Sequence, residues 1–220
     1  MQRTSRTRVR RSPERAVYDD ETISAILDAG FLCHIGFVQD DQPFVIPTLY
    51  VRVGAQLYLH GSPHSRLLQA VEGGLPVCIT VTHVDGLVLA RSAFHHSINY
   101  RSVMILGRGQ VITEQTEKEA VLSALVEHIL PGRSAEVRRP SARELEATQV
   151  LAVPLQEASA KVRTGPPKDA RRDYALPIWA GELPLRLEAL APVSDPRGAL
   201  DLPVPAHVER WRHGINARVR

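Results

Sequence analysis

Hydrophobic and polar residues alternate with a period of two along much of the chain, and turn residues interrupt these runs at short intervals. Such alternation is typical of half-buried strands. The pair Asp85-Gly86 is typical of a tight hairpin turn between two of these runs. The sequence therefore predicts strands over residues 31–38, 44–53, 56–60, 76–83, 87–94 and 100–112.

Six strands that follow one another closely favour a closed or partly closed antiparallel barrel, because closure removes exposed strand edges. A sandwich of two sheets stays open as the alternative. A further strand is predicted over residues 149–157, where Pro154 favours a position at a sheet edge or a bulge.

Apolar residues recur with the period of a helix in three segments outside the predicted strands. Thr116 is the predicted cap of the longest helix, and Ser141 with Glu144 three residues later predicts a short capped helical turn. Acidic residues open the first helix, where they suit the positive end of the helix dipole. The three predicted helices cover residues 19–29, 64–73 and 116–130.

Past Arg163 the chain is rich in proline and is predicted to form loops. We therefore expect three parts. A basic N-terminal arm covers residues 1–18, one folded domain covers residues 19–190, and a Pro-rich C-terminal tail covers residues 191–220.

Charge is unevenly distributed over the 220 residues, whose formal net charge is +3. Clustered arginines can bind phosphates, so the N-terminal arm could hold a weak anionic partner such as nucleic acid or acidic lipid. A basic terminus without any specific partner is the alternative. Five of the first eleven residues are arginines, namely Arg3, Arg6, Arg8, Arg10 and Arg11.

Cysteine usage and hydropathy indicate the compartment. Cys33 and Cys78 both lie inside apolar runs, which is typical of small core residues in a reducing compartment. No apolar run approaches the length that a membrane span needs. We expect a cytoplasmic protein without a membrane segment.

The segment from Leu57 to Gly74 predicts a strand that ends beside a small anion site. The strand is broken after His60, and Ser65 and Arg66 open the helix that follows. Free N–H groups at a helix start, a hydroxyl and a guanidinium together suit a phosphate. The alternative is an ordinary helix in which the serine only caps the first turn.

Four motifs in a fixed order carry a resemblance to a known family. They are His60-Gly61-Ser62, Ser65-Arg66, Asn99-Tyr100-Arg101-Ser102-Val103 and Trp179-Ala180-Gly181. This order resembles the FMN-binding split-barrel family of pyridoxamine 5'-phosphate oxidase, and most closely its nitroimidazole-reductase-like subgroup. The similarity runs from about residue 18 to residue 190.

The resemblance implies a mainly β fold, namely a six-stranded antiparallel split β-barrel of Greek-key type with flanking α-helices. It further implies a homodimer with FMN held at the subunit interface. Ser65 and Arg66 would hold the phosphate beside Gly61, and Ser102 would lie near the reactive edge of the flavin. The other residues assigned to the cofactor by the resemblance are Ile46, Pro47 and Thr48 along the ring, Asn99 and Tyr100 beside Ser102, and Trp179 from the other subunit, with Lys161 and Arg163 neutralising charge.

Two departures from the family pattern argue against vitamin B6 oxidation. Those oxidases carry consecutive arginine and lysine at the helix start, where this chain has Ser65-Arg66-Leu67. Their arginine and histidine pair near the C-terminus has no counterpart that we can place here.

His60 is the predicted catalytic residue. In the reductase-like subgroup a histidine at this strand end lies near the flavin, where an imidazole could donate to N1 or O2 or protonate a substrate. A structural histidine bonded to backbone is the alternative. The pair His95-His96 would point to opposite faces of a strand, so no metal site is expected.

The resemblance implies an FMN-dependent oxidoreductase that acts on a small planar acceptor, such as a nitro compound or a quinone, with NAD(P)H as donor. Two alternatives stay open. One is a non-catalytic flavin- or haem-binding protein for sensing or storage, and the other is a deazaflavin-dependent reductase on the same fold.

Overall fold

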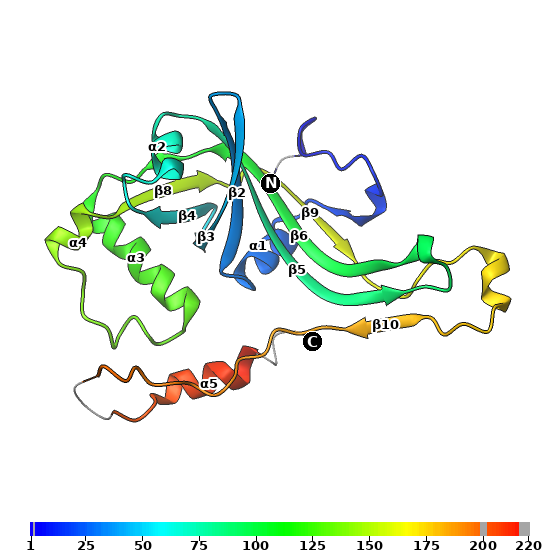
Figure 1. Cartoon of the computed structure of the whole chain (residues 1–220). Coiled ribbons are helices and arrows are strands. Elements are labelled where there is room, and N and C mark those ends of the chain that lie inside the picture. Colours follow the sequence, from blue (N-terminus) through cyan, green and yellow to red (C-terminus); the bar gives the residue numbers. More distant parts are fainter. Residues whose placement is uncertain (2, 199–201, 216–220) are drawn as a thin grey trace.

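Ten strands of the described chain pair antiparallel in one continuous sheet, with helices on its flanks (Figure 1). The computed structural model describes residues 1, 3–198 and 202–215. The strands are β1 (Ala16–Val17), β2 (Leu32–Gln39), β3 (Gln42–Val53), β4 (Gln56–Gly61), β5 (Pro76–Leu89), β6 (Ser97–Arg108), β7 (Gln110–Val111), β8 (Gln149–Pro154), β9 (Glu157–Arg163) and β10 (Gly181–Pro184).

The strand order is β1-β9-β6-β5-β2-β3-β4-β8-β7, and β10 pairs with the outer part of β5. The predicted mainly antiparallel β fold with flanking helices is confirmed. The strand count exceeds the predicted six, because short strands at both ends of the sheet and late in the chain add to it.

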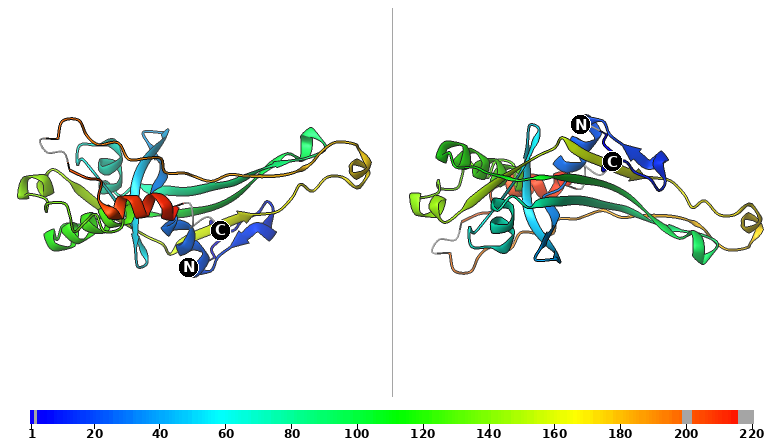
Figure 2. Two further views of the ribbon diagram at one scale, coloured as in Figure 1. Left: turned by 90° about the horizontal axis from the view of Figure 1, so that it is seen from below. Right: turned by 90° about the horizontal axis from the view of Figure 1, so that it is seen from above.

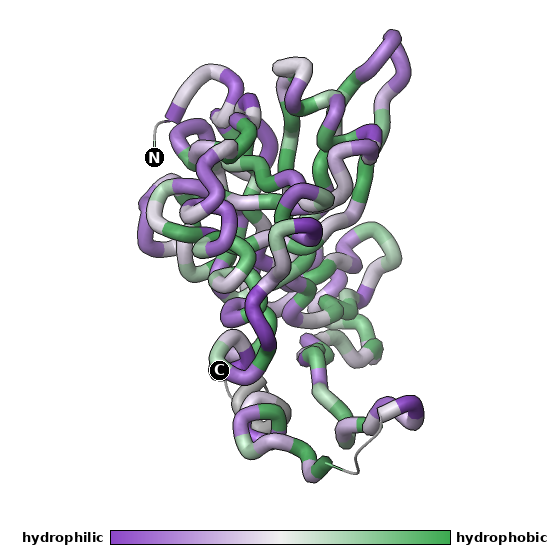
Figure 3. Tube along the Cα trace, turned by 90° about the vertical axis from the view of Figure 1, so that its left-hand side faces the viewer, coloured by the Kyte–Doolittle hydropathy of each residue, from purple (hydrophilic) through white to green (hydrophobic). Residues whose placement is uncertain are grey.

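The core forms where alternate strand residues point to one side. On β2 the side chains of Cys33, Ile35 and Phe37 are buried, while their neighbours are exposed or half-buried. They meet the apolar stripe of the first helix and buried residues of β4, β5, β6 and β8. Burial raises the pKa of the Cys33 thiol to about 12, as expected of a core residue. Short hydrophobic and hydrophilic stretches alternate along the chain (Figure 3).

The predicted hairpin turn at Asp85-Gly86 is wrong. Neither residue has the left-handed backbone that a two-residue hairpin requires, and β5 continues through both of them. The extra residue forms a β-bulge against β6, between Val84 and Gly86. Pairing with β6 on one side and β10 on the other keeps this strand extended, and the chain reverses only at η2 (Ala93–His95).

The helices are α1 (Asp20–Asp28), α2 (Arg66–Glu72), α3 (Gln115–Ile129), α4 (Ala142–Glu146) and α5 (Ala206–Ile215), with 3-10 turns η1 (Pro13–Arg15), η2 and η3 (Arg171–Ala175). Asp19 caps α1, and Ser141 and Glu144 form the predicted capping box of α4. The predicted cap at Thr116 is wrong, since α3 begins after Glu114, which makes no side-chain capping bond.

The single strand predicted over residues 149–157 divides into β8 and β9, joined by a turn. Pro154 is the last residue of β8, at the end of its pairing with β4. The Pro-rich segment after Arg163 contains β10 and α5 as well as loops. The division into residues 1–18, 19–190 and 191–220 stays a prediction.

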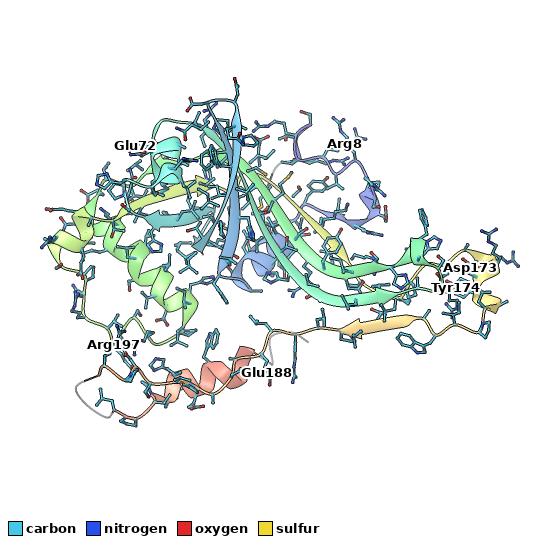
Figure 4. All side chains as sticks on the ribbon, viewed as in Figure 1. Arg8, Glu72, Asp173, Tyr174, Glu188 and Arg197 are labelled. Atoms are coloured by element: carbon cyan, nitrogen blue, oxygen red, sulfur yellow. The ribbon has the colours of Figure 1, made fainter. Side chains whose placement is uncertain are left out.

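The outer parts of β5 and β6 project from the sheet together with η2, η3 and β10 (Figures 1 and 2). We call this projection, residues 84–100 and 164–184, the hairpin extension. Asp173 and Tyr174 lie at its far end (Figure 4). The described N-terminal residues contact β9 instead, where Glu157 accepts a hydrogen bond from Thr4 at 2.8 Å and pairs with Arg6.

None of the described helices combines the length and the apolar character that a membrane span requires.

Candidate functional site

The start of α2 has the geometry of an ordinary capped helix. The Ser65 hydroxyl accepts a hydrogen bond from the Leu68 N–H at 3.3 Å, which is the capping role left open by the sequence. The exposed Arg66 guanidinium lies 4.2 Å from the centroid of the Phe44 ring on β3. Arg66 makes no ion pair with any other described residue, so its charge is available to an anion.

His60 and Gly61 end β4, directly before the turn to α2. They pair with Val150 and Gln149 of β8. The Nδ1 atom of His60 is buried and has no hydrogen-bond partner among the described residues. Burial lowers the pKa of His60, so its imidazole is neutral at pH 7.

Ile46, Pro47 and Thr48 lie in the middle of β3, opposite residues of β2. Ile46 packs against the core, Thr48 is half-buried and Pro47 is exposed. Strand β3 pairs with β4, and Arg66 at the start of α2 contacts Phe44 of β3, so the predicted ring and phosphate residues lie on neighbouring elements. We call this group, with His60, Gly61, Ser65 and Arg66, the α2 region.

The predicted residues on β6 lie elsewhere in the same chain. Asn99 is buried, donates to Glu182 of β10 at 2.5 Å and accepts from Arg163 of β9. Ser102 donates to the Lys161 carbonyl at 3.4 Å. Asn99 and Arg163 therefore join three strands of the hairpin extension and its base.

The strand order separates these β6 residues from the α2 region. Strands β5 and β2 lie between β6 and β3, and neighbouring strands are about 4.8 Å apart, so the separation along the sheet is on the order of 14 Å. Tyr100 also lies on β6, opposite Val84 of β5, and so belongs to the β6 group. Among the described residues, no hydrogen bond or ion pair joins the two groups of predicted residues within one chain.

Trp179 lies in the loop before β10 and is 69% exposed. Its ring packs beside Gly181, where an added Cβ would lie 2.9 Å from a ring carbon. The loop belongs to the hairpin extension, which projects away from α2 (Figure 1). Its role as a ring cover supplied to a second subunit stays a prediction.

A cavity of about 460 Å³ lies between the main sheet and α5, in the size range of small-molecule and cofactor sites. We call it the α5 cavity. The segment after α1, strands β5 and β6, the end of α3, the chain after β10 and helix α5 all contribute to its walls. Its apolar lining residues are Ala29, Phe31, Val84, Ile129, Pro131, Leu185, Leu187 and Trp211.

His207 of α5 is one of the residues that line this cavity, and it is 8% exposed. Its Nδ1 lies 3.1 Å from a carboxylate oxygen of Glu136, which follows α3. Its Nε2 is fully enclosed and has no hydrogen-bond partner among the described residues. Gly132, with φ of 91°, lets the loop after α3 pass close to the His207 side chain, where an added Cβ would lie 3.4 Å away.

The other histidines of the α5 cavity have partners. His83 Nε2 donates to the Ile26 carbonyl at 3.0 Å, and His128 Nε2 donates to the Gly30 carbonyl at 2.6 Å. A carbonyl only accepts, so each of these nitrogens carries its proton. A Cβ on Gly30 would lie 2.8 Å from the His83 ring, so only glycine fits there without a shift of the ring.

Three arginines line the same cavity. Arg101 is held by both carboxylate oxygens of Asp85, at 2.8 and 3.0 Å. Arg186 and Arg210 are exposed and have no ion-pair partner in the part of the chain that the structure describes. The α5 cavity thus combines apolar walls, an enclosed imidazole nitrogen without a partner and two cations without an ion-pair partner among the described residues, which suits a flat, largely apolar ligand that bears carboxylates.

Sequence reasoning missed this cavity, because residues 191–220 were predicted to form a tail. A signal was nevertheless present after Pro205. His207, Arg210 and Trp211 have the spacing i, i+3, i+4, which places three side chains on one face of a helix. That face is the one that lines the cavity.

Comparison with known proteins identifies relatives over most of the chain. The model of a family described as pyridoxamine 5'-phosphate oxidase matches residues 19–162. The structure of the flavocytochrome Anf3 from Azotobacter vinelandii is 44% identical, with a TM-score of 0.89, covering 94% of this chain and 96% of that one. No curated protein matches the chain.

A FAD and haem binding protein from Mycobacterium smegmatis is 36% identical, with a TM-score of 0.86, covering 90% of this chain and 97% of that one. A proposed 5-nitroimidazole antibiotic resistance protein from Bacteroides thetaiotaomicron is 23% identical, with a TM-score of 0.57, covering 67% of this chain and 86% of that one. This last similarity extends to the fold alone.

Proposed function

The chain belongs to the pyridoxamine 5'-phosphate oxidase family, and we propose that it is a redox protein that binds a flavin and a haem. The observation that carries the proposal is the similarity to a flavocytochrome and to a FAD and haem binding protein, at 44% and 36% identity over at least nine tenths of the chain. Because the family model ends at residue 162, those two similarities also include more than half of the segment that follows it.

The α2 region would hold the flavin. Arg66 has an unpaired charge at a helix start, and His60 adds a neutral imidazole with a free Nδ1. The resemblance predicted FMN, whereas the name of the M. smegmatis protein specifies FAD. We propose FAD as the first candidate and FMN as the second, since both present a phosphate to the same arginine.

The α5 cavity fits a haem by its own chemistry. Apolar side chains form its walls, Arg186 and Arg210 lack carboxylate partners, and His207 has an enclosed Nε2 without a partner. A buried polar atom without a partner is costly unless a ligand satisfies it. A flavin supplies two-electron chemistry and a haem supplies one-electron chemistry.

The reaction itself rests on the resemblance. We propose that NAD(P)H is the electron donor and that a small planar compound, such as a nitro compound or a quinone, is the acceptor. A non-catalytic sensor or storage protein and a deazaflavin-dependent reductase are the alternatives. Bleaching of the bound flavin by NAD(P)H without oxygen, and its return on addition of an acceptor, would support the enzyme.

We also propose a homodimer built on the hairpin extension. Large apolar side chains are exposed there, including Phe94 at 89% and Trp179 at 69% exposure. A second copy would cover them and would bring Trp179, Asn99 and Tyr100 toward a partner's α2 region. Light scattering should give twice the chain mass, and Phe94→Asp should lower it. An unchanged monomer mass in the unmutated protein would contradict this assembly.

The first experiment loads the purified protein with FAD, FMN and haem in turn and removes the excess by gel filtration. The proposal expects the absorption bands of flavin and the Soret band of haem to elute with the protein. Chromatography of the released flavin then distinguishes FAD from FMN. Failure to retain any flavin would contradict the flavin proposal, and failure to retain haem would contradict the haem proposal.

A further inference from the structure

We propose that His207 is the axial ligand of the haem iron, through Nε2, and that Arg186 and Arg210 bind the haem carboxylates. This inference rests on the proposed binding of haem and assigns the site to the α5 cavity. None of these three residues was predicted from the sequence, and all three lie after residue 162, where the family model ends.

The two ring nitrogens of His207 have the environments that a metal-binding imidazole needs. The carboxylate of Glu136 lies 3.1 Å from Nδ1 and accepts its proton, which leaves the lone pair on Nε2. A ligating histidine commonly donates its second nitrogen to a carboxylate in this way, which orients the ring and raises its basicity. Arg133 pairs with the other oxygen of Glu136 at 3.3 Å and holds that carboxylate in place.

A buried polar atom without a partner indicates a ligand that would satisfy it, and Nε2 of His207 is such an atom. The atom is enclosed and lacks a partner among the described residues, and His207 is one of the residues around a cavity large enough for a cofactor. His83 and His128 line the same cavity, but their Nε2 atoms donate to backbone carbonyls. His207 is therefore the cavity histidine with a buried ring nitrogen that has no partner among the described residues.

The remaining walls match the rest of a haem. A porphyrin needs apolar contact on both faces, and Phe31, Ile129 and Leu187 belong to three different elements around the cavity. Two carboxylates need two cations. Arg186 and Arg210 lie after β10 and on α5, are exposed, and have no ion-pair partner among the described residues, whereas Arg101 is already neutralised by Asp85.

The test compares haem binding and spectra of the full-length protein and of His207→Gly. We expect the variant to bind haem more weakly by at least about 100-fold, beyond the about 10–100-fold typical of outer-shell partners. Added imidazole should restore the Soret position of the unmutated protein, because it can occupy the space of the lost ring. His96→Ala, which removes an exposed histidine of the hairpin extension, is the control and should bind haem normally.

Two further variants keep the proposal testable if His207→Gly does not fold. His207→Met retains a ligand atom, and a thioether ligand should raise the reduction potential of the bound haem. Glu136→Gln should still bind haem, but with an affinity about tenfold lower, because the amide orients the His207 ring less well than the carboxylate does. An unchanged spectrum and affinity in both would overturn the assignment of His207.

The outcomes separate the two levels of the proposal. If the unmutated protein binds no haem, the proposed haem function fails and the assignment fails with it. If it binds haem and every His207 variant keeps the same Soret band and affinity, only the assignment is wrong. If His207→Gly loses flavin while it keeps haem, the α5 cavity is the flavin site and the assignment is also overturned.

Discussion

Two histidines mark two regions of the molecule, and each has one buried ring nitrogen without a partner. His60 lies on a strand between β3 and β8, in a region where Ser65 already caps a helix and Arg66 already contacts Phe44. His207 lies on a helix beside a cavity, with two unpaired arginines around it. A free imidazole nitrogen can bind a ligand only where the surrounding structure also leaves space for that ligand.

Under the proposed function, the same sheet would serve two cofactors in two different ways. In the α2 region the ligand would be held at the surface of the β-structure, mainly by charge. In the α5 cavity it would be enclosed between the sheet and a helix from the end of the chain. Four variants, one of them a double substitution, test whether the two regions act independently.

Arg66→Ala should weaken flavin binding by about 1.5 to 3 kcal/mol, the range of a charge-assisted hydrogen bond, and should leave haem binding unchanged. The measurement is a flavin titration followed by fluorescence, with Arg143→Ala on the exposed surface of α4 as the control. Equal flavin affinity in both variants would remove Arg66 from the flavin site.

The double variant Arg186→Ala/Arg210→Ala should weaken haem binding about tenfold, because both arginines are exposed and solvent reduces the value of each ion pair. Flavin binding should not change. Haem titration at low and high salt provides the measurement, and the effect should shrink as salt rises. Arg197→Ala, which removes an arginine that pairs with Asp195, is the control; a loss of flavin in the double variant would mean that the two regions are coupled.

Gly86→Ala should destabilise the contact between β5 and β10 by about 1 kcal/mol, because an added Cβ would lie 3.1 Å from the Leu183 carbonyl oxygen. The chain after β10 forms part of the α5 cavity, so haem retention should fall while flavin retention stays the same. Gly36→Ala on β2 is the control, since its nearest atom would lie at 3.6 Å. Urea denaturation and haem retention are measured together, and equal behaviour of both variants would contradict this link.

His60→Gln should reduce the loss of stability on acidification. The pKa of His60 is lowered by burial, so below the ordinary histidine pKa of about 6.5 the unfolded chain binds more protons than the folded chain. This contribution to stability is complete above about pH 6.5 and is lost as the pH falls toward the lowered pKa. Urea denaturation at about pH 7.5 and pH 5.5 measures it; a pH dependence identical to that of the unmutated protein would show that His60 does not contribute.

Local patterns predicted the elements whose determinants are adjacent in sequence. Asp19 before α1 and Ser141 with Glu144 at α4 are caps that form within one helical turn. The alternation along β2 likewise requires only that one side face the core. Predictions failed where pairing with a strand distant in sequence determines the backbone conformation. At Asp85-Gly86, β6 and β10 pair with β5 on both sides and keep it extended.

The same distinction applies to the candidate sites. Arg66 and His60 were found because a strand end, a turn and a helix start follow directly in the sequence. Strand β9 was missed because Ala158, Ser159 and Ala160 are small and show no clear alternation, although all three are buried. The α5 cavity was missed because its walls come from six separated segments.

The antiparallel β fold, the family and the charge at the start of α2 could be predicted from the sequence, because periodicity, capping and motif order are properties of neighbouring residues. The contact between Glu136 and His207, and the cavity that Arg186 and Arg210 line with His207, became visible in the folded chain alone. The physical reason is that a buried nitrogen becomes unsatisfied only after folding has removed water from it and has set which groups surround it.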